Sequence, residues 1–526
     1  MKMKRKIKYS FAATLMVLLL FSAGCTKDFE EINTNPNSPG IEQASPSMLL
    51  TNAIESMTDR VHEIFFGHEM GSCWVQHMAK VQYPDEDRYI PRMGVINTTW
   101  NSFYGASGYD VKVLIDIAES TENDSYKAVG LILKSYLTSV ITDEWGDIPY
   151  TEAWQGSNTE KPVLSPVYDT QESVYAALIA NLTEANTLLT DDAPEIEGDI
   201  LFGNDLMAWK KFANSLRLRL LMRRSDRVDP TTDMTAIFGN IATYPIFESN
   251  ADNAALIYLG SNPNNNPINE NRKTRDDHRV SKTIVDYLYA EAPSPDYRVG
   301  VYAELADKSG DWVGLPNGME SADALNYLGN GLSQTSKIGS YFSAASAPGM
   351  LMSYAELMFI KAEAAKRGFI PGGDASAEAA YHAGIKASWD QYNADGSFEA
   401  SLEVWRSTFE SWGMTDENIY DYAWQDFVDW GGTYDYVAAT GLEQICTQKW
   451  VAMFDQGAQA AFEWRRTGWP VLTPAVAGMN GGKIPVRAYY PSDEAGRNPT
   501  NLAAAVTHQG KDDLNTRVWW DTKDNY

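Results

Sequence analysis

Apolar residues recur at helical spacing over long stretches of this chain, and this periodicity limits the possible folds more than any other feature. The clearest stretch carries Leu351, Tyr354, Ala355, Met358, Ala362 and Ala365. Steps of mostly three and four residues place these side chains on one face of an α-helix. Gly368 and residues 371–373 then interrupt the pattern, and Asp374 can cap a second helix that runs to about Tyr392. We therefore predict a helical hairpin.

Similar helical patterns predict further pairs along the chain. They cover residues 96–119 with 126–142, residues 170–189 with 206–224, and a single helix over 442–466. The predicted fold class is mainly α, built from tetratricopeptide-like helix-turn-helix pairs. No residue pattern repeats with a period of 34, so this is a prediction of architecture and not a motif match.

Residues 240–347 differ from the rest because they are rich in Asn, Pro and Gly and show little helical periodicity. We predict a loop-rich irregular segment supported by the helices. Binding residues often lie on loops that a rigid scaffold holds in place. This segment and the loop over residues 82–94 are therefore the first places to expect a ligand-binding site.

The N-terminus has the composition of a secretory signal that ends at a cysteine. Five basic residues between Lys2 and Lys8 precede an apolar run from Phe11 to Phe21, and small residues lead to Cys25. This order predicts a lipoprotein signal peptide over residues 1–24 and a lipidated Cys25. An ordinary secreted protein and an uncleaved signal anchor are the alternatives. The apolar run is shorter than the about 20 residues of a membrane span.

Residues 25–46 are polar and contain several Asn and Pro, so we expect a flexible tether between the lipid and a single domain over 47–526. Residues 26–31 resemble the signal that sends some Gram-negative lipoproteins to the outer face of the outer membrane. Without residues 1–24 the chain has 38 basic and 70 acidic residues, a formal charge of -32. Such a surface is a poor partner for nucleic acid.

Two cysteines remain, Cys73 and Cys446, and they are far apart in the sequence. Free buried thiols are favoured over a disulfide. His62 and His68 flank a segment similar to a zinc-protease helix, but histidines six positions apart would lie on different faces of one helix. The sequence predicts no metal site and no cofactor.

Catalytic motifs for serine-esterase and phosphoryl chemistry are missing from the sequence. A glycosidase pair depends on the distance between two carboxylates, so Asp143 with Glu144, and Asp426 near Trp430, stay open as candidates. For each of these acids, a solvated or helix-capping role beside a packed tryptophan is favoured. A surface-anchored glycoside hydrolase is therefore the alternative function.

Several short motifs together resemble one family, the SusD/RagB-type nutrient-binding outer-membrane lipoproteins. They are residues 28–37 (DFEEINTNPN), 146–150 (GDIPY), 214–219 (NSLRLR), 354–356 (YAE), 362–365 (AEAA), 384–388 (GIKAS), 463–470 (EWRRTGWP), 484–487 (IPVR), 489–491 (YYP) and 518–521 (VWWD). Several of these motifs look structural; Arg465 and Arg466, for example, are expected to satisfy carbonyls at a helix end.

The resemblance implies a SusD-like helical domain and a non-catalytic surface lipoprotein. Such a protein captures an oligosaccharide or a peptide and delivers it to a SusC/RagA-type TonB-dependent transporter in the outer membrane. The lipid-anchored chain would then face the cell exterior, with its helical-repeat side toward the transporter.

No ligand residue is taken from the family, so the predicted site depends on residue chemistry alone. Aromatic faces can stack on a ligand while Arg, Asp and Asn groups bind its hydroxyls or amides. We predict that an N-terminal group faces a group in the loop-rich segment, and core packing is the alternative role for each aromatic. The first group is Tyr83, Asp85, Asp87, Arg88, Tyr89, Trp100 and Asn101, and the second is Trp312, Asn317, Tyr327 and Tyr341.

Overall fold

The computed structural model describes residues 44–158, 161–289, 294–415 and 418–524, and residues from Pro46 onward form one compact unit. Cys25, the signal peptide and nearly all of the predicted tether lie outside the described residues. The fold is mainly α-helical, as predicted. No helix among the described residues has both the length and the apolar character needed to span a membrane.

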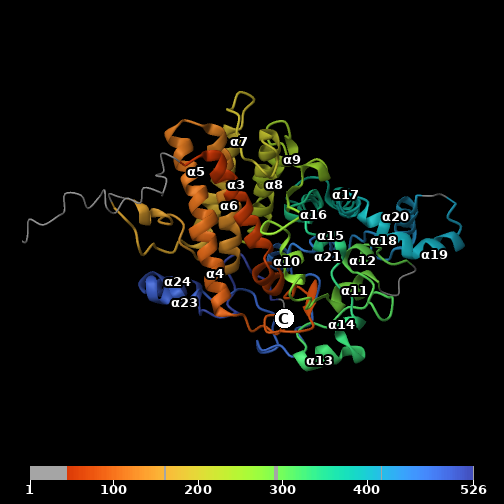
Figure 1. Ribbon diagram of the computed structural model, residues 1–526. Helices are drawn as coiled ribbons and strands as arrows, with labels where there is room; N and C mark the ends of the chain where they lie inside the picture. Colours follow the sequence, from red (N-terminus) through yellow and green to blue (C-terminus); the bar gives the residue numbers. More distant parts are fainter. Residues whose placement is uncertain (1–43, 159–160, 290–293, 416–417, 525–526) are drawn as a thin grey trace, which may run out of the picture. The chain divides into compact units, whose positions relative to one another are not determined.

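Antiparallel helix pairs form the first half of the unit. Their bounds are α3 Pro46–His62, α4 Met93–Ser102, α5 Gly108–Ser120, α6 Asp124–Trp145, α7 Gln171–Leu188, α8 Leu206–Arg223 and α9 Thr231–Gly239. Consecutive helices from α5 to α8 pack against each other, and α3 packs on α5 (Figure 1). This stack confirms the predicted tetratricopeptide-like architecture.

The predicted hairpin is confirmed as α16 Tyr354–Lys366 and α17 Gly373–Tyr392. The first helix starts later than its apolar pattern because β4 Pro348–Met352 precedes it. Ser353 ends the strand and caps the helix by accepting a hydrogen bond from the Glu356 amide. The periodicity thus gave the right helices and a wrong first boundary.

The prediction of one helix over 442–466 is wrong. The structure has α21 Gly441–Ala452 and α22 Gly457–Thr467, separated by a turn in which Asp455 adopts a φ of 70°. Gly457 then touches the π-helix Ile64–Ser72, where a Cβ atom on Gly457 would lie 1.9 Å from the Gly67 carbonyl oxygen. Only a glycine permits this close backbone approach at the start of α22.

The described residues of the range 240–347 form only short elements, in agreement with the predicted loop-rich segment. They are β2 Ala254–Ile257, α10 Pro267–Arg272, β3 His278–Val280, α11 Lys282–Leu288, α12 Val299–Tyr302, α13 Ser321–Asn326, α14 Gly331–Gln334 and α15 Ser340–Ser343. Strand β3 pairs antiparallel with β1 Met78–Lys80, and β2 pairs with β4. These two small sheets attach the segment to the helices.

The remaining helices lie between α17 and the C-terminal end. They are α18 Ser397–Leu402, α19 Arg406–Ser411, α20 Ile419–Trp430, α23 Ser492–Arg497 and α24 Pro499–Gln509. Both cysteines that the structure describes, Cys73 and Cys446, are buried and free. The prediction of free thiols is confirmed.

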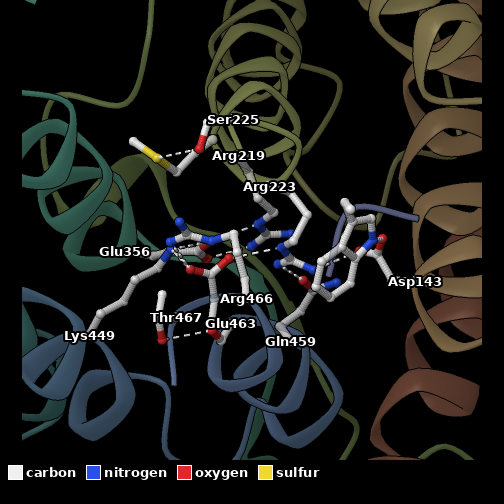
Figure 2. A network of polar contacts seen from close by, with 12 residues as sticks. Asp143, Arg219, Arg223, Ser225, Glu356, Lys449, Gln459, Glu463, Arg466 and Thr467 are labelled. Atoms are coloured by element: carbon white, nitrogen blue, oxygen red, sulfur yellow. Dashed lines mark hydrogen bonds and ion pairs between the residues drawn. The ribbon is translucent and has the colours of Figure 1, made fainter. Parts of the chain in front are cut away.

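Residues from several of the sequence motifs meet in one buried polar network, which Figure 2 shows in close-up. Glu463 on α22 pairs with Arg223 (2.9 Å), Lys449 (2.9 Å) and Arg466 (2.8 Å), and Arg219 pairs with Glu356 (2.5 Å). These helices are therefore joined by charges inside the core. The motifs over residues 214–219, 354–356 and 463–470 therefore have a structural role, as predicted for several of the motifs.

The predicted role of the arginines at the end of α22 needs correction. Arg466 binds the Glu363 carboxylate through both Nη atoms at 2.6 Å, and Arg465 pairs with Glu144 at 3.0 Å. Both arginines are buried partners of acids on other helices. Their main role is to join helices and not to satisfy the end of their own.

Candidate functional site

An aromatic pocket of about 380 Å³ is the strongest candidate for a ligand site in the described part of the chain. It lies between the α4–α5 region, the loop after α6 and helix α23. Its lining includes Trp100, Asn101, Tyr104, Tyr109, Pro149, Trp154, Leu164, Glu494, Arg497 and Asn498. Pockets of this size with apolar walls and a few polar groups suit small organic ligands. We call it the Trp154 pocket.

Trp154 enters this pocket with a left-handed backbone, at a φ of 60°. Its indole Nε1 donates a 2.7 Å hydrogen bond to the Tyr104 carbonyl, and its ring packs on the backbone at Gly108. A Cβ atom on Gly108 would lie 2.6 Å from the indole, so the glycine makes room for the ring. Strained residues that the fold holds in place are concentrated at functional sites.

The polar groups of the pocket are partly engaged. The Tyr168 hydroxyl donates to Glu494 at 2.6 Å, and the Tyr104 hydroxyl donates to the Pro149 carbonyl at 2.8 Å. Burial and the nearby Glu494 charge raise the pKa of both tyrosines far above the usual range, so both stay protonated. The exposed Asn101 side chain has no hydrogen bond among the described residues and is free to bind a ligand.

Two of the predicted residues, Trp100 and Asn101, lie in this pocket. The Trp100 side chain is only 4% exposed and packs on Trp145, Tyr104 and Tyr490. It therefore forms the floor of the pocket, and its removal would also disturb the core.

The predicted contact between the first loop and the loop-rich segment exists. Arg88 pairs with Glu320 at 3.3 Å, and the Arg275 guanidinium lies 4.2 Å from the ring centre of Tyr83. Tyr83 is 63% exposed and Asp85 is also exposed, so both can meet a ligand on this face. The face is a second place where a ligand can bind.

Three predicted residues in this region are buried and position the loop. The Asn317 amide donates to Asp87 at 2.8 Å, and the Tyr89 hydroxyl accepts from the Ala475 amide at 2.8 Å. Burial raises the pKa of Asp87 to about 6 against the opposing effect of hydrogen bonds from the Gly318 amide and Asn317. These groups fix the loop beside the loop-rich segment.

The other predicted residues lie elsewhere. Trp312 stacks on Trp405 with ring centres 4.4 Å apart, and Tyr341 packs on Phe342 and Tyr392. Trp312 and Tyr327 line a separate small pocket of about 140 Å³ that shares no residue with the Trp154 pocket. The structure thus does not bring all the predicted aromatic residues into one site.

The sequence prediction missed Trp154, Tyr104, Tyr109 and Arg497 as pocket residues. Trp154 follows the GDIPY motif by a few residues, and Tyr104 follows Trp100 by one helical turn. The sequence could therefore have predicted these two residues. Arg497 comes from the far end of the chain, and only the fold places it beside α4.

The carboxylates considered for glycosidase chemistry are engaged inside the fold. Asp143 is buried and accepts hydrogen bonds from Arg223 at 2.6 Å, Trp520 at 2.7 Å and the Tyr175 hydroxyl. Asp426 accepts from the hydroxyls of Tyr297 and Ser294. The favoured role as a solvated or capping acid is therefore wrong for Asp143, which is buried, whereas Asp426 is half-buried and holds two hydroxyls.

His62 and His68 do not lie on one continuous helix, so the assumption behind their predicted spacing is wrong. Helix α3 ends at His62, and His68 lies in the π-helix that follows. Burial lowers the pKa of His62 to about 4, and burial together with the neighbouring histidines holds the pKa of His68 well below its usual value. Among the described residues, no group of three or more His, Cys, Asp and Glu side chains is placed to hold a metal ion.

Comparison with known proteins identifies the family. Residues 36–491 match the SusD-like_2 family model, described as "Starch-binding associating with outer membrane". The match covers most of the chain, which therefore belongs to the SusD-like family. A comparison with curated protein sequences found no significant match.

Solved structures of SusD homologues share the fold. A chitin-binding SusD homologue from Flavobacterium johnsoniae is 25% identical, with a TM-score of 0.71 over 91% of this chain and 100% of that one. A SusD homologue from Bacteroides fragilis is 26% identical, with a TM-score of 0.71 over 92% and 100%. A further structure, titled chitin-binding protein, is 25% identical with a TM-score of 0.73 over 91% and 100%.

Proposed function

We propose that this protein is a non-catalytic surface lipoprotein that captures a nutrient oligosaccharide and delivers it to a TonB-dependent outer-membrane transporter. The Trp154 pocket is the observation that carries the proposal, because aromatic rings beside the free Asn101 amide suit sugar rings. Family membership and the chitin-binding relatives support a glycan ligand. A peptide is the alternative ligand.

The absence of catalysis is part of the proposal. The acids considered for hydrolysis, Asp143, Glu144 and Asp426, are engaged in structural hydrogen bonds or ion pairs. Asp143 is buried, so it cannot approach a glycosidic bond without breaking the core. We therefore expect the captured glycan to leave the protein with its chain length unchanged.

Replacing Trp154 by alanine tests the pocket. We expect the variant to bind the native oligosaccharide about 2 kcal/mol more weakly, roughly a thirtyfold rise in Kd, because the stacking face is lost. Titration calorimetry with the wild-type ligand measures the change. The Asn101→Ala variant removes an exposed pocket side chain without touching the core, and it should also weaken binding.

The control is Trp430→Ala, which removes a tryptophan that is 62% exposed at the end of α20 and lines none of the pockets described above. Full affinity in this control together with weaker binding in both pocket variants supports the site. Full affinity in both Trp154→Ala and Asn101→Ala would show that the ligand binds elsewhere. The face around Tyr83, Asp85 and Arg88 would then be the next place to test.

We further propose that Cys25 carries the lipid that holds the chain on the outer face of the outer membrane. Several acyl chains buried in a leaflet anchor a protein far more firmly than a single one. The Cys25→Ala variant should lose fatty-acid labelling and leave the membrane fraction. Unchanged labelling would contradict the lipidation site.

The proposed transporter partner is supported by family membership. Extraction with mild detergent followed by affinity purification should recover a large outer-membrane barrel protein together with this chain. Recovery of the chain alone, under conditions that keep other membrane complexes together, would count against the partnership.

A further inference from the structure

A second large pocket lies where helices α16, α21 and α22 meet the C-terminal part of the chain. Its volume is about 510 Å³, and it shares no lining residue with the Trp154 pocket. Apolar and charged groups line it together, among them Leu442, Cys446, Arg367, Asp226 and Lys523. Trp469 is the one aromatic residue in its described lining, so we call it the Trp469 pocket.

The end of α22 places Trp469 beside this pocket. Gly468 adopts a left-handed φ of 75°, and its amide donates to the Trp464 carbonyl at 2.8 Å, which ends the helix. The Trp469 amide then donates to the Thr467 hydroxyl at 3.2 Å. These bonds fix the backbone from which the indole projects.

The Trp469 indole is half-buried but lacks the partners that a tryptophan in a core has. It does not pack on the hydrophobic core, and no other aromatic ring stacks on it among the described residues. Its Nε1 atom makes no hydrogen bond with any described residue and stays in contact with solvent. Both the face of the ring and its N–H group are therefore free to meet a ligand.

Arg367 offers a second free donor in the same pocket. The Ser225 hydroxyl at 2.8 Å, Glu363 at 3.1 Å and Asp226 hold its guanidinium, and all three bind its Nη atoms. The Nε atom has no hydrogen-bond partner among the described residues and also stays in contact with solvent. The guanidinium is thus fixed in orientation, with one N–H group left for a ligand.

The charges that line the pocket balance one another. They belong to three cations and three acids, Arg367, Arg466, Lys523, Asp226, Glu363 and Asp524. Burial alone would raise the pKa of Asp226 and Glu363, but Arg367 and Arg466 hold these pKa values below the usual range, so both acids are charged at neutral pH. An ionic ligand therefore gains no net attraction from the pocket.

The remaining groups suit hydroxyls, which both donate and accept hydrogen bonds. The Lys523 side chain is 50% exposed and can donate, and the Asp524 side chain is 87% exposed and can accept. A ligand with a flat face and several hydroxyls would meet the indole and these polar groups together. A sugar residue has this combination.

We propose that the Trp469 pocket is a second glycan-binding site, and that it takes an uncharged sugar residue of an oligosaccharide. The sugar stacks on the indole, while its oxygens accept from the free N–H groups of Trp469 and Arg367. The choice of a sugar rests on the proposed function of the protein, whereas the preference for an uncharged ligand rests on the pocket alone.

Titration calorimetry with maltotriose and chitotriose counts the sites. We expect two molecules of at least one of these trisaccharides to bind each wild-type chain. Trp469→Ala and Trp154→Ala should each leave one site, because the Kd of the altered site rises at least tenfold. The double variant should bind neither trisaccharide.

A charged pair of probes tests the class of ligand. In the Trp154→Ala variant, the glucosamine trimer and trigalacturonate should bind no more tightly than the better of the two uncharged trisaccharides. Tighter binding of either charged trisaccharide, lost in the double variant, would overturn the uncharged class.

The Trp469→Ala variant is expected to fold, because the indole does not pack on the core, and its melting temperature should match that of the wild type. Trp469→Phe restores a stacking face without the N–H group and should recover part of the affinity of this site. Trp430→Ala is the control, since it removes an exposed tryptophan outside both pockets and should keep two sites.

The number of sites separates this proposal from the proposed function. A single site that Trp154→Ala removes and Trp469→Ala leaves unchanged would overturn the second site and keep the proposed glycan capture. A single site that depends on Trp469 alone would support this pocket and overturn the Trp154 pocket. No binding of any trisaccharide would overturn both.

Discussion

Replacing Glu463 by glutamine is expected to lower the free energy of unfolding by about 3–5 kcal/mol. This glutamate faces Arg223, Lys449 and Arg466 within 2.9 Å, all of them buried. Burial alone would raise its pKa, but the three cations hold the pKa well below its usual range. Glutamine keeps the shape and loses the charge, so the cations remain buried with less compensation.

Denaturant unfolding of the wild type and the variant at pH 7 measures this effect. Glu443→Gln is the control, because it makes the same change at an exposed position on α21 and should alter stability by less than about 0.5 kcal/mol. The pKa of Glu463 is lowered in the folded state, so the stabilisation from its charge is lost as the pH falls from about 4.5 through the folded-state pKa. The free energies of unfolding of the wild type and the variant should therefore become more alike in acid. Equal stability at pH 7 would contradict the structural role of the network.

Replacing Gly457 by alanine is expected to destabilise the protein by about 3 kcal/mol or more, because the added Cβ atom meets backbone and not a movable side chain. It would lie 1.9 Å from the Gly67 carbonyl oxygen and 2.4 Å from the Ser72 nitrogen. On the other side of the contact, a Cβ atom on Gly71 would lie 2.5 Å from the Ala458 nitrogen. The π-helix and the start of α22 must separate to make room for the added Cβ atom.

Gly94→Ala is the matched control for this change. Gly94 lies in the first turn of α4, and a Cβ atom there would meet nothing within 4 Å. Alanine is favoured over glycine inside a helix, so this variant should be as stable as the wild type or up to about 1 kcal/mol more stable. Thermal unfolding of both variants measures the effect. A Gly457→Ala variant with the same melting temperature as the wild type would contradict the packing argument.

Periodicity predicted the helices well because each of them buries one face. The pairs α5–α6, α7–α8 and α16–α17 follow directly from apolar spacing. It failed between α21 and α22, where Asp455 turns the chain so that Gly457 can meet the π-helix. That break depends on a contact between residues almost 400 positions apart, which local spacing does not contain.

The site was harder to predict because the chemistry of an aromatic residue does not reveal its burial. Trp312 and Tyr341 have the same ring chemistry as Trp154, yet they pack against other aromatic rings in the core. Asp87 and Asn317 do lie next to each other, as predicted, but they meet in a buried hydrogen bond.

The central claim is that the protein captures a glycan without cleaving it. Its most direct test is titration calorimetry of the wild-type protein with neutral starch-type and chitin-type oligosaccharides, followed by mass spectrometry of the sugars recovered from each titration. We predict saturable binding of at least one of these glycans and recovery of every chain at its original length. Shortened products, or binding of peptides with none of the glycans bound, would contradict the claim.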